Sequence, residues 1–142
     1  SNPMDVHTLI KALDDEDNSH LLELTHDKIK KINLHIIKEL HLSRAKLLEI
    51  MNKLEDYRYV DEMNEMKYGY YIRWISIVDP DNIVLSHGGL FCDLKVTDDG
   101  VFVVYKNFNH RYYQFKMDEC LIFQKLSNQE QVLLSALDHI SR

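Results

Sequence analysis

The chain has 142 residues, of which 45% are apolar and 28% charged, and it contains four Gly and two Pro. This composition is typical of an ordered globular protein with a buried core, and it excludes a linker-like or low-complexity chain. The net charge of −6 argues against bulk, non-specific binding to nucleic acid.

The charge is distributed unevenly along the chain. Residues 1–24 carry six acidic side chains and one Lys, whereas residues 25–54 carry seven basic and three acidic side chains. Residues 55–66 are acidic again, with five acids and one Arg, and residues 67–126 balance at seven against seven. An interaction with a polyanion would therefore use the basic block at residues 25–54.

A short first helix is predicted after Asp5, which is a good N-cap residue. Its apolar positions follow the i, i+3, i+4, i+7 pattern, at Val6, Leu9, Ile10 and Leu13. The acidic run at residues 14–17 then predicts a solvated turn, with binding of a cation or of the basic block as the alternatives.

Two amphipathic helices are predicted next, one beginning after Thr25 and the other after Ser43, because both residues are favourable N-caps. A short connection at residues 40–42 joins them, which is the layout of a helix-turn-helix unit. Residues 42–55 also resemble the second and third helices of winged-helix regulators. The simpler alternative is a helical hairpin with lysines on its solvated face.

In the helix-turn-helix interpretation the second of these helices would enter a groove of nucleic acid. The polar and basic side chains that could form a nucleic-acid or partner surface in this block are Lys28, Lys31, Arg44, Lys46, Asn52 and Lys53.

Residues 67–126 predict a run of short antiparallel strands, because β-branched and aromatic segments alternate with turn residues. The five predicted strands are residues 68–78, 89–97, 101–107, 111–117 and 120–126. We expect a curved sheet or a small barrel. The acidic residues 55–66 are predicted to extend the preceding helix briefly or to form a connector.

The predicted hairpin at residues 101–117 mixes aromatic and basic side chains. Its candidate surface residues are Lys106, Arg111, Tyr112 and Lys116. Such a mixture is typical of single-strand nucleic-acid surfaces and of protein-binding faces, although Tyr and Phe are also ordinary strand residues.

A capping box at residues 127–130 predicts a C-terminal helix that packs on the sheet or on the N-terminal helices. The predicted fold is therefore α+β, with an N-terminal helical region at residues 4–60. Residues 61–142 would hold an antiparallel β-meander of about five strands and the C-terminal helix, and both parts would pack as one compact unit.

Recognised catalytic motifs are absent from the sequence: there is no HExxH, GxSxG, Walker loop or GxGxxG. Two residue pairs could meet a metal ion but match no recognised zinc spacing, His87 with Cys92 and His20 with His26. We assign no catalytic, cofactor-binding or metal-binding residue and expect a non-enzymatic protein. A small enzyme would need a polar cleft that collects Asp93, His87 or His110.

The two cysteines, Cys92 and Cys120, lie in apolar segments and are expected to be buried, reduced thiols. No apolar run approaches the roughly 18 residues that a membrane span needs, and no secretory signal pattern is present. We therefore expect a protein that is neither secreted nor bound to a membrane.

Several segments of the sequence resemble those of a family of small uncharacterised proteins of nucleocytoplasmic large DNA viruses. These are the giant viruses of the marseillevirus and mimivirus kinds. The resemblance covers about residues 50–140, at residues 53–62, 70–74, 88–89 with Asp93, 106–107, 121–126 and 129–131. It implies a viral protein that acts in the host cytoplasm, at the viral factory, or in the virion. It implies no catalytic activity.

Together these observations predict an interaction protein that binds a viral or host protein, with a homodimer as a further expectation. The alternative is a nucleic-acid-binding factor in viral transcription or genome handling, and binding that weakens steeply with salt would distinguish it.

Overall fold

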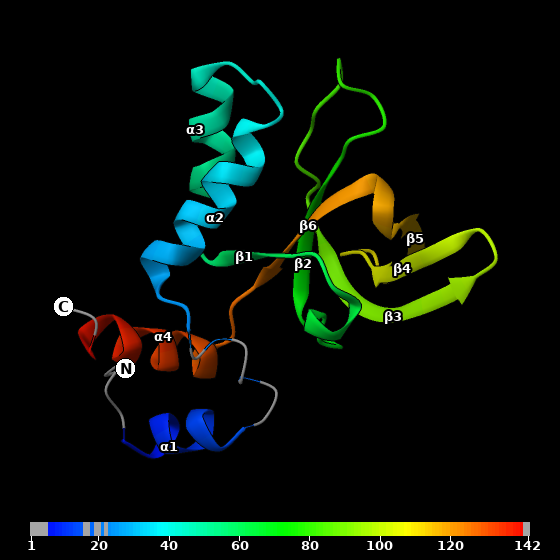
Figure 1. The fold of residues 1–142 in the computed structure, drawn as a ribbon. Helices are drawn as coiled ribbons and strands as arrows, with labels where there is room; N and C mark the ends of the chain where they lie inside the picture. Colours follow the sequence, from blue (N-terminus) through cyan, green and yellow to red (C-terminus); the bar gives the residue numbers. More distant parts are fainter. Residues whose placement is uncertain (1–5, 16–17, 19–20, 22, 141–142) are drawn as a thin grey trace.

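A computed structural model of the chain describes residues 6–15, 18, 21 and 23–140 (Figure 1). These residues form an α+β fold with helices at both ends of the chain and an antiparallel sheet between them, which confirms the predicted fold class. The helices are α1 Val6–Asp14, α2 His26–Lys38, α3 Arg44–Lys53 and α4 Asn128–Ile140. The strands are β1 Tyr57–Val60, β2 Tyr71–Ser76, β3 Gly89–Thr97, β4 Gly100–Lys106, β5 Tyr112–Lys116 and β6 Cys120–Lys125. Two short 3₁₀ helices are η2 Met63–Glu65 and η3 Met117–Glu119.

The sheet has six strands in the order β1-β6-β2-β3-β4-β5, and every neighbouring pair is antiparallel. Strands β2 to β5 follow one another as the predicted meander, whereas β6 returns to lie between β1 and β2. The sheet does not close on itself, so the small-barrel alternative is wrong. A register shift between Phe91 and Asp93 marks a bulge in β3, and bulges bend the strand that carries them.

Strand β1 was not predicted, because residues 55–66 were interpreted as a helix extension or a connector. The structure corrects this: α3 ends at Lys53, and β1 pairs with β6 from Tyr57 opposite Lys125 to Val60 opposite Ile122. Side chains on both faces of β1 are buried, so the segment lacks the alternation of a half-buried strand. The expected boundary between residues 60 and 61 falls at the end of this strand.

The outer edge of β1 is closed by one side chain of α2. The Asn33 amide donates from Nδ2 to the carbonyl oxygen of Tyr57 (2.9 Å), and its Oδ1 accepts from the Tyr59 N–H (3.0 Å). Asn33 is 2% exposed. It therefore takes the place of a neighbouring strand and satisfies backbone groups that an uncovered edge would leave unpaired.

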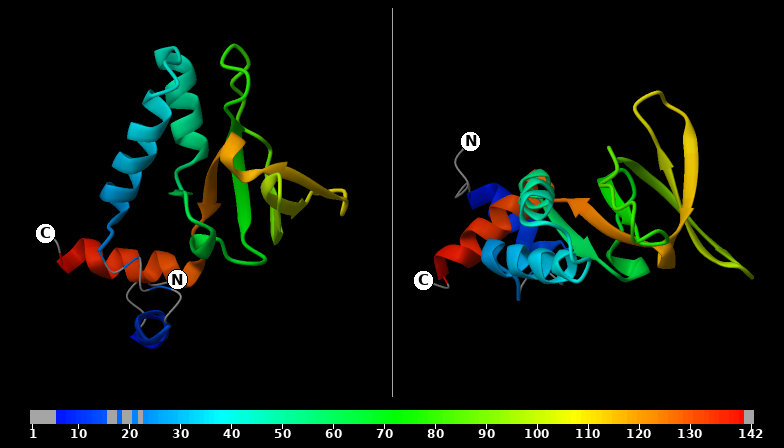
Figure 2. Two further views of the ribbon diagram at one scale, coloured as in Figure 1. Left: turned by 45° about the vertical axis from the view of Figure 1, so that its right-hand side comes forward. Right: turned by 90° about the horizontal axis from the view of Figure 1, so that it is seen from above.

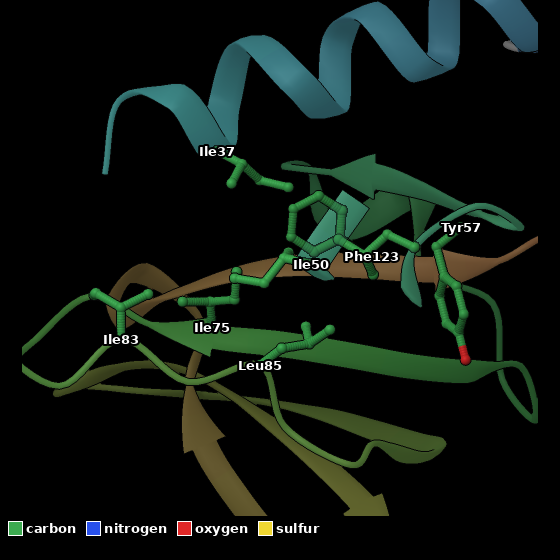
Figure 3. Close-up of a cluster of buried hydrophobic side chains, with 8 residues drawn as sticks. Ile37, Ile50, Tyr57, Ile75, Ile83, Leu85 and Phe123 are labelled. Atoms are coloured by element: carbon green, nitrogen blue, oxygen red, sulfur yellow. The ribbon is translucent and has the colours of Figure 1, made fainter. Parts of the chain in front are cut away.

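Two apolar clusters lie on opposite faces of the sheet. In the first, Ile37 and Ile50 of the helices meet Ile75 and Phe123 of the strands (Figure 3). The second packs the inward side chains of β3, β4 and β5 against Trp74. The helices α2 and α3 thus cover one face of the strands β1, β6 and β2.

The predicted local signals are confirmed at three helix ends. Thr25 and Ser43 accept from the backbone N–H groups of the third residues after them, each at 3.2 Å. At α4 the Ser127 N–H donates to Glu130 Oε1 (2.9 Å) and the Glu130 N–H donates to Ser127 Oγ (3.1 Å), which completes the capping box. The predicted N-cap Asp5 lies outside the described residues.

Helix α4 packs against the N-terminal helices, one of its two predicted positions. Leu133 of α4 is buried with Ala12 of α1 and with Leu21. Of the apolar face predicted for α1, Leu9 packs partly buried against this cluster, whereas Val6, Ile10 and Leu13 are exposed. α4 covers the side of α1 that carries Ala12, a small residue that the apolar periodicity did not include.

Candidate functional site

The helices α2 and α3 run side by side in opposite directions and form a helical hairpin (Figure 2). A helix-turn-helix unit crosses its helices at about 90–120°. The hairpin arrangement therefore lends no support to a recognition-helix role for α3.

Three predicted cations of this hairpin have partners close to them in the sequence. Lys31 pairs with Asp27 at 2.9 Å, and Lys53 pairs with Glu49 at 3.0 Å. The Lys28 ammonium donates to the carbonyl oxygen of Glu23 (3.2 Å). Arg44 and Asn52 are exposed and Lys46 is half-buried. Asn52 lines a pocket between the helices, whereas the predicted basic residues of this block lie along solvated helix surfaces and do not surround a common cleft.

The other predicted surface residues meet on one face of the sheet. The register places Lys106 opposite Tyr112, with the Lys106 ammonium 5.7 Å from the centre of the Tyr112 ring. Lys116 lies opposite Phe102, which also has Lys95 opposite it on β3. We call this set, Lys95, Phe102, Lys106, Tyr112 and Lys116, the basic sheet face.

The basic sheet face is not covered by a helix, because the β3–β4–β5 end of the sheet extends away from all four helices (Figures 1 and 2). Within the described residues none of its three lysines forms an ion pair. The structure therefore separates the predicted residues into two surfaces, the helical hairpin and this face, and Arg111 lies exposed at the turn beside the second one.

A groove that was not predicted lies where β1 ends and β6 begins. It has a volume of about 890 Å³ and is lined by apolar side chains that include Met63, Ile77 and Leu121. Its charged lining residues are Asp61, Glu62 and Asp118. We call it the acidic groove, and among the described residues that line it there is no Lys, Arg or His.

The acidic groove exists because β1 is short. Pairing of β1 with β6 ends at Val60 opposite Ile122, and the chain then turns away into η2. Cys120 and Leu121 of β6 pair with β2 but have no strand on their other side. Met63 is 46% exposed and Ile77 41% exposed, so the groove leaves large apolar side chains in contact with solvent.

The only sequence signal for this groove was the excess of acids at residues 55–66, five against one Arg. The apolar part gave no signal, because Ile77, Val101 and Met117 are far apart in the sequence and meet only when the sheet forms.

The acids of η2 are crowded around Glu65. Its Oε1 accepts from the Glu62 N–H (3.2 Å), while Oε2 pairs with the buried Arg58 (2.9 Å). A hydrogen bond with the Glu65 carboxyl, partial burial and the negative charge of Glu65 raise the pKa of Asp61. Folding therefore favours the neutral form of Asp61, and its ionised form at neutral pH destabilises the fold.

We expect Asp61→Asn to raise the melting temperature at pH 7, because it removes this repulsion. The contribution of Asp61 to stability should fall as pH rises from the ordinary Asp pKa through the raised folded pKa, so the difference in melting temperature between the two proteins should vanish below that window. Thermal melts followed by circular dichroism between about pH 3 and 7 measure this. A lower melting temperature for the variant at pH 7 would contradict the argument.

A second, more polar pocket lies between α2, α3 and α4 and contains an ion pair that the sequence did not indicate. His26 Nδ1 lies 2.5 Å from Asp138 Oδ2, and His26 Nε2 lies 2.6 Å from Gln131 Oε1. Both ring nitrogens are thus engaged in linking α2 to α4. Because both nitrogens have partners within the fold, we interpret the pair as a structural contact.

Both cysteines are free thiols and half-buried. Burial, with Glu119 and Asp118 nearby, raises the pKa of Cys120 to about 11. In a Cys92→Ser variant we expect modification of Cys120 by a disulfide reagent to accelerate about tenfold per pH unit between about pH 8 and 10, since the thiolate is the reactive form. A rate that is flat over this range would show that the thiol is already ionised.

A small enzyme was expected to need a polar cleft with Asp93, His87 or His110, and neither of the two pockets described above is lined by any of these residues. No group of three or more potential metal ligands is found among the described residues. None of the helices in the described part of the chain has the length and apolarity that a membrane crossing needs.

The fold and its surfaces thus define an α+β protein with an open antiparallel sheet, an acidic groove and a basic sheet face. Comparisons with protein families, with curated proteins and with solved structures find no match for this chain.

Proposed function

We propose that the protein is a non-enzymatic interaction protein that binds a viral or host protein through the acidic groove. The observation that supports this is the exposure of two large apolar side chains, Met63 and Ile77, in a groove with a volume of about 890 Å³. Apolar patches in a groove rimmed by polar residues mark interaction sites. The proposed setting, host cytoplasm or virion, is the one that the family resemblance implies.

The test compares two variants that place the same charge at an exposed apolar position. Ile77→Asp alters the groove, whereas Val84→Asp alters an exposed side chain that does not line it. Each protein is immobilised and exposed to an infected-cell lysate. The wild-type chain and Val84→Asp should retain the same partner protein, and Ile77→Asp should not retain it. Equal retention by Ile77→Asp, or no retained protein at all, would overturn the proposal.

A second candidate function is single-stranded nucleic-acid binding, and the basic sheet face favours it. Three lysines that form no ion pair with any other described residue lie on a strand surface with Phe102 and Tyr112, and such surfaces combine phosphate contacts with base stacking. The protein's net charge of −6 opposes this binding.

Binding of labelled single-stranded DNA and RNA at about 50 and 200 mM salt tests this candidate. Salt-sensitive binding should be lost in the Lys106→Ala, Lys116→Ala double variant and retained in the Arg44→Ala, Lys46→Ala double variant. Both variants remove two cations, so a difference between them locates the surface. Absence of binding at the lower salt concentration would eliminate the candidate.

A further inference from the structure

All the charged residues that line the acidic groove are acids. Its charged lining residues are Asp61, Glu62 and Asp118, and Lys116, which lies beside the lining residues Gly100 and Met117, is a basic side chain at its border. Arg58 is buried and pairs with Glu65, so it adds no cation to the exposed rim of the groove. A ligand that brings cations to this rim would gain electrostatic complementarity that the free protein lacks.

The carboxyl groups close together at η2 also favour a ligand that carries cations. Asp61 and Glu65 lie close enough to disfavour the ionised form of Asp61, a local cost to folding. A cation placed beside Asp61 by a ligand would relieve this repulsion. Binding and stability then make opposite demands on one side chain, as is common at functional sites.

The apolar part of the acidic groove contains two methionines, Met63 and Met117, beside Ile77 and Leu121. Methionine side chains are unbranched and polarisable, so they adapt to the shape of an apolar ligand. The groove therefore suits a ligand with an apolar stripe between basic flanks.

The backbone around the groove favours a helical ligand over an extended one. An extended peptide binds by adding a strand to a free sheet edge. Here the pairing of β1 with β6 leaves only Cys120 and Leu121 beyond its end, which is shorter than the usual strand of three residues or more. A helix satisfies its own backbone hydrogen bonds and needs only side-chain contacts.

We propose that the acidic groove binds a lysine- or arginine-rich amphipathic helix of a partner protein, with its apolar stripe on Met63, Ile77 and Leu121 and its cations at Asp61 and Asp118. This inference rests on the proposed function, because it names the kind of partner that the groove takes.

The test uses two fluorescein-labelled peptides of about 18 residues, a length at which an isolated helix can form. Both carry the same Leu and Met stripe, and their polar positions hold Lys in one peptide and Glu in the other. Fluorescence anisotropy with the full chain at about 50 and 150 mM salt should show the Lys peptide binding at least about tenfold more tightly. Ile77→Asp should abolish this binding and Val84→Asp should preserve it.

A charge-reversal pair controls for the net charge of the protein. The Asp61→Lys, Asp118→Lys double variant should bind the Lys peptide about tenfold or more weakly than the wild type. The control is the Asp81→Lys, Asp93→Lys double variant, which changes the net charge equally at positions outside the groove. Its affinity for the Lys peptide should stay within about twofold of the wild-type value. Equal losses in both double variants would overturn the placement of the cations at Asp61 and Asp118.

The outcomes separate this inference from the proposed function. If the Glu peptide binds equally well and Ile77→Asp abolishes its binding, the basic-helix inference fails while protein binding at the groove stands. If neither peptide binds, the inference is overturned, and the lysate comparison decides the proposed function independently.

Discussion

Replacing Asn33 with alanine is expected to destabilise the protein by about 2–4 kcal/mol, because two backbone groups of β1 lose their partner. The Tyr57 carbonyl oxygen and the Tyr59 N–H would both be left unsatisfied at or near the protein interior. Each buried polar group without a partner costs about 1–3 kcal/mol, and the solvent that reaches Tyr59 lowers its share. Urea denaturation at 25 °C, followed by circular dichroism, measures the change in the free energy of unfolding.

Lys30→Ala is the matched control for the Asn33 variant, since it truncates an exposed side chain of the same helix. We expect it to change the free energy of unfolding by less than about 0.5 kcal/mol. If Asn33→Ala is no more destabilising than Lys30→Ala, the amide does not protect the edge of β1. In that case β1 would have to be held by its pairing with β6 alone.

Glu130→Ala is expected to cost about 3–5 kcal/mol, the typical penalty for removing one partner of a buried ion pair. Glu130 is 1% exposed, and its Oε2 lies 3.2 Å from the ammonium of Lys67, which is itself largely buried. The substitution would leave that ammonium without a carboxylate partner, with the Asn18 side-chain oxygen 3.2 Å away and the centre of the Tyr70 ring 5.4 Å away. It would also remove the carboxylate of the capping box at Ser127.

A second substitution separates these two effects. In the Glu130→Ala, Lys67→Met double variant no buried charge is left unpaired, while the capping box is still lost. We expect the double variant to be more stable than Glu130→Ala alone, since apolar replacement of both partners is often close to neutral. If the two variants are equally unstable in urea, the loss of stability comes from the lost helix cap and from packing, and not from the unpaired Lys67 ammonium.

Both variants probe contacts that join distant parts of the chain. Asn33 bonds to residues more than twenty positions away, and Glu130 reaches Lys67 across 63 positions. Neither residue carried a sequence signal beyond its own helix: Asn33 was one polar position in a predicted helix, and Glu130 was recognised only for its capping role. Long-range pairing depends on how the elements pack, which local periodicity does not encode.

The candidate site shows the same division. The sequence predicted the basic and aromatic surface of the β4–β5 hairpin, because strand alternation and the turn residues determine which side chains share a face. The acidic groove could not be predicted from the sequence. It forms at the end of β1, a strand that the periodicity did not indicate, and three further segments converge on it.

The sequence by itself determined the elements whose causes are local. Thr25, Ser43 and the pair Ser127 with Glu130 act within three residues, and the turn at residues 98–99 needs only the adjacent Gly100 with its positive φ of 124°. The fold class followed from these elements and their order.

The tertiary structure alone decided that β6 lies between β1 and β2, that the sheet stays open, and that acids and methionines from separate segments share one groove. The physical reason is that capping and turn formation are satisfied within a few residues. Strand order and concave surfaces instead depend on burying side chains and backbone groups that are far apart in the chain.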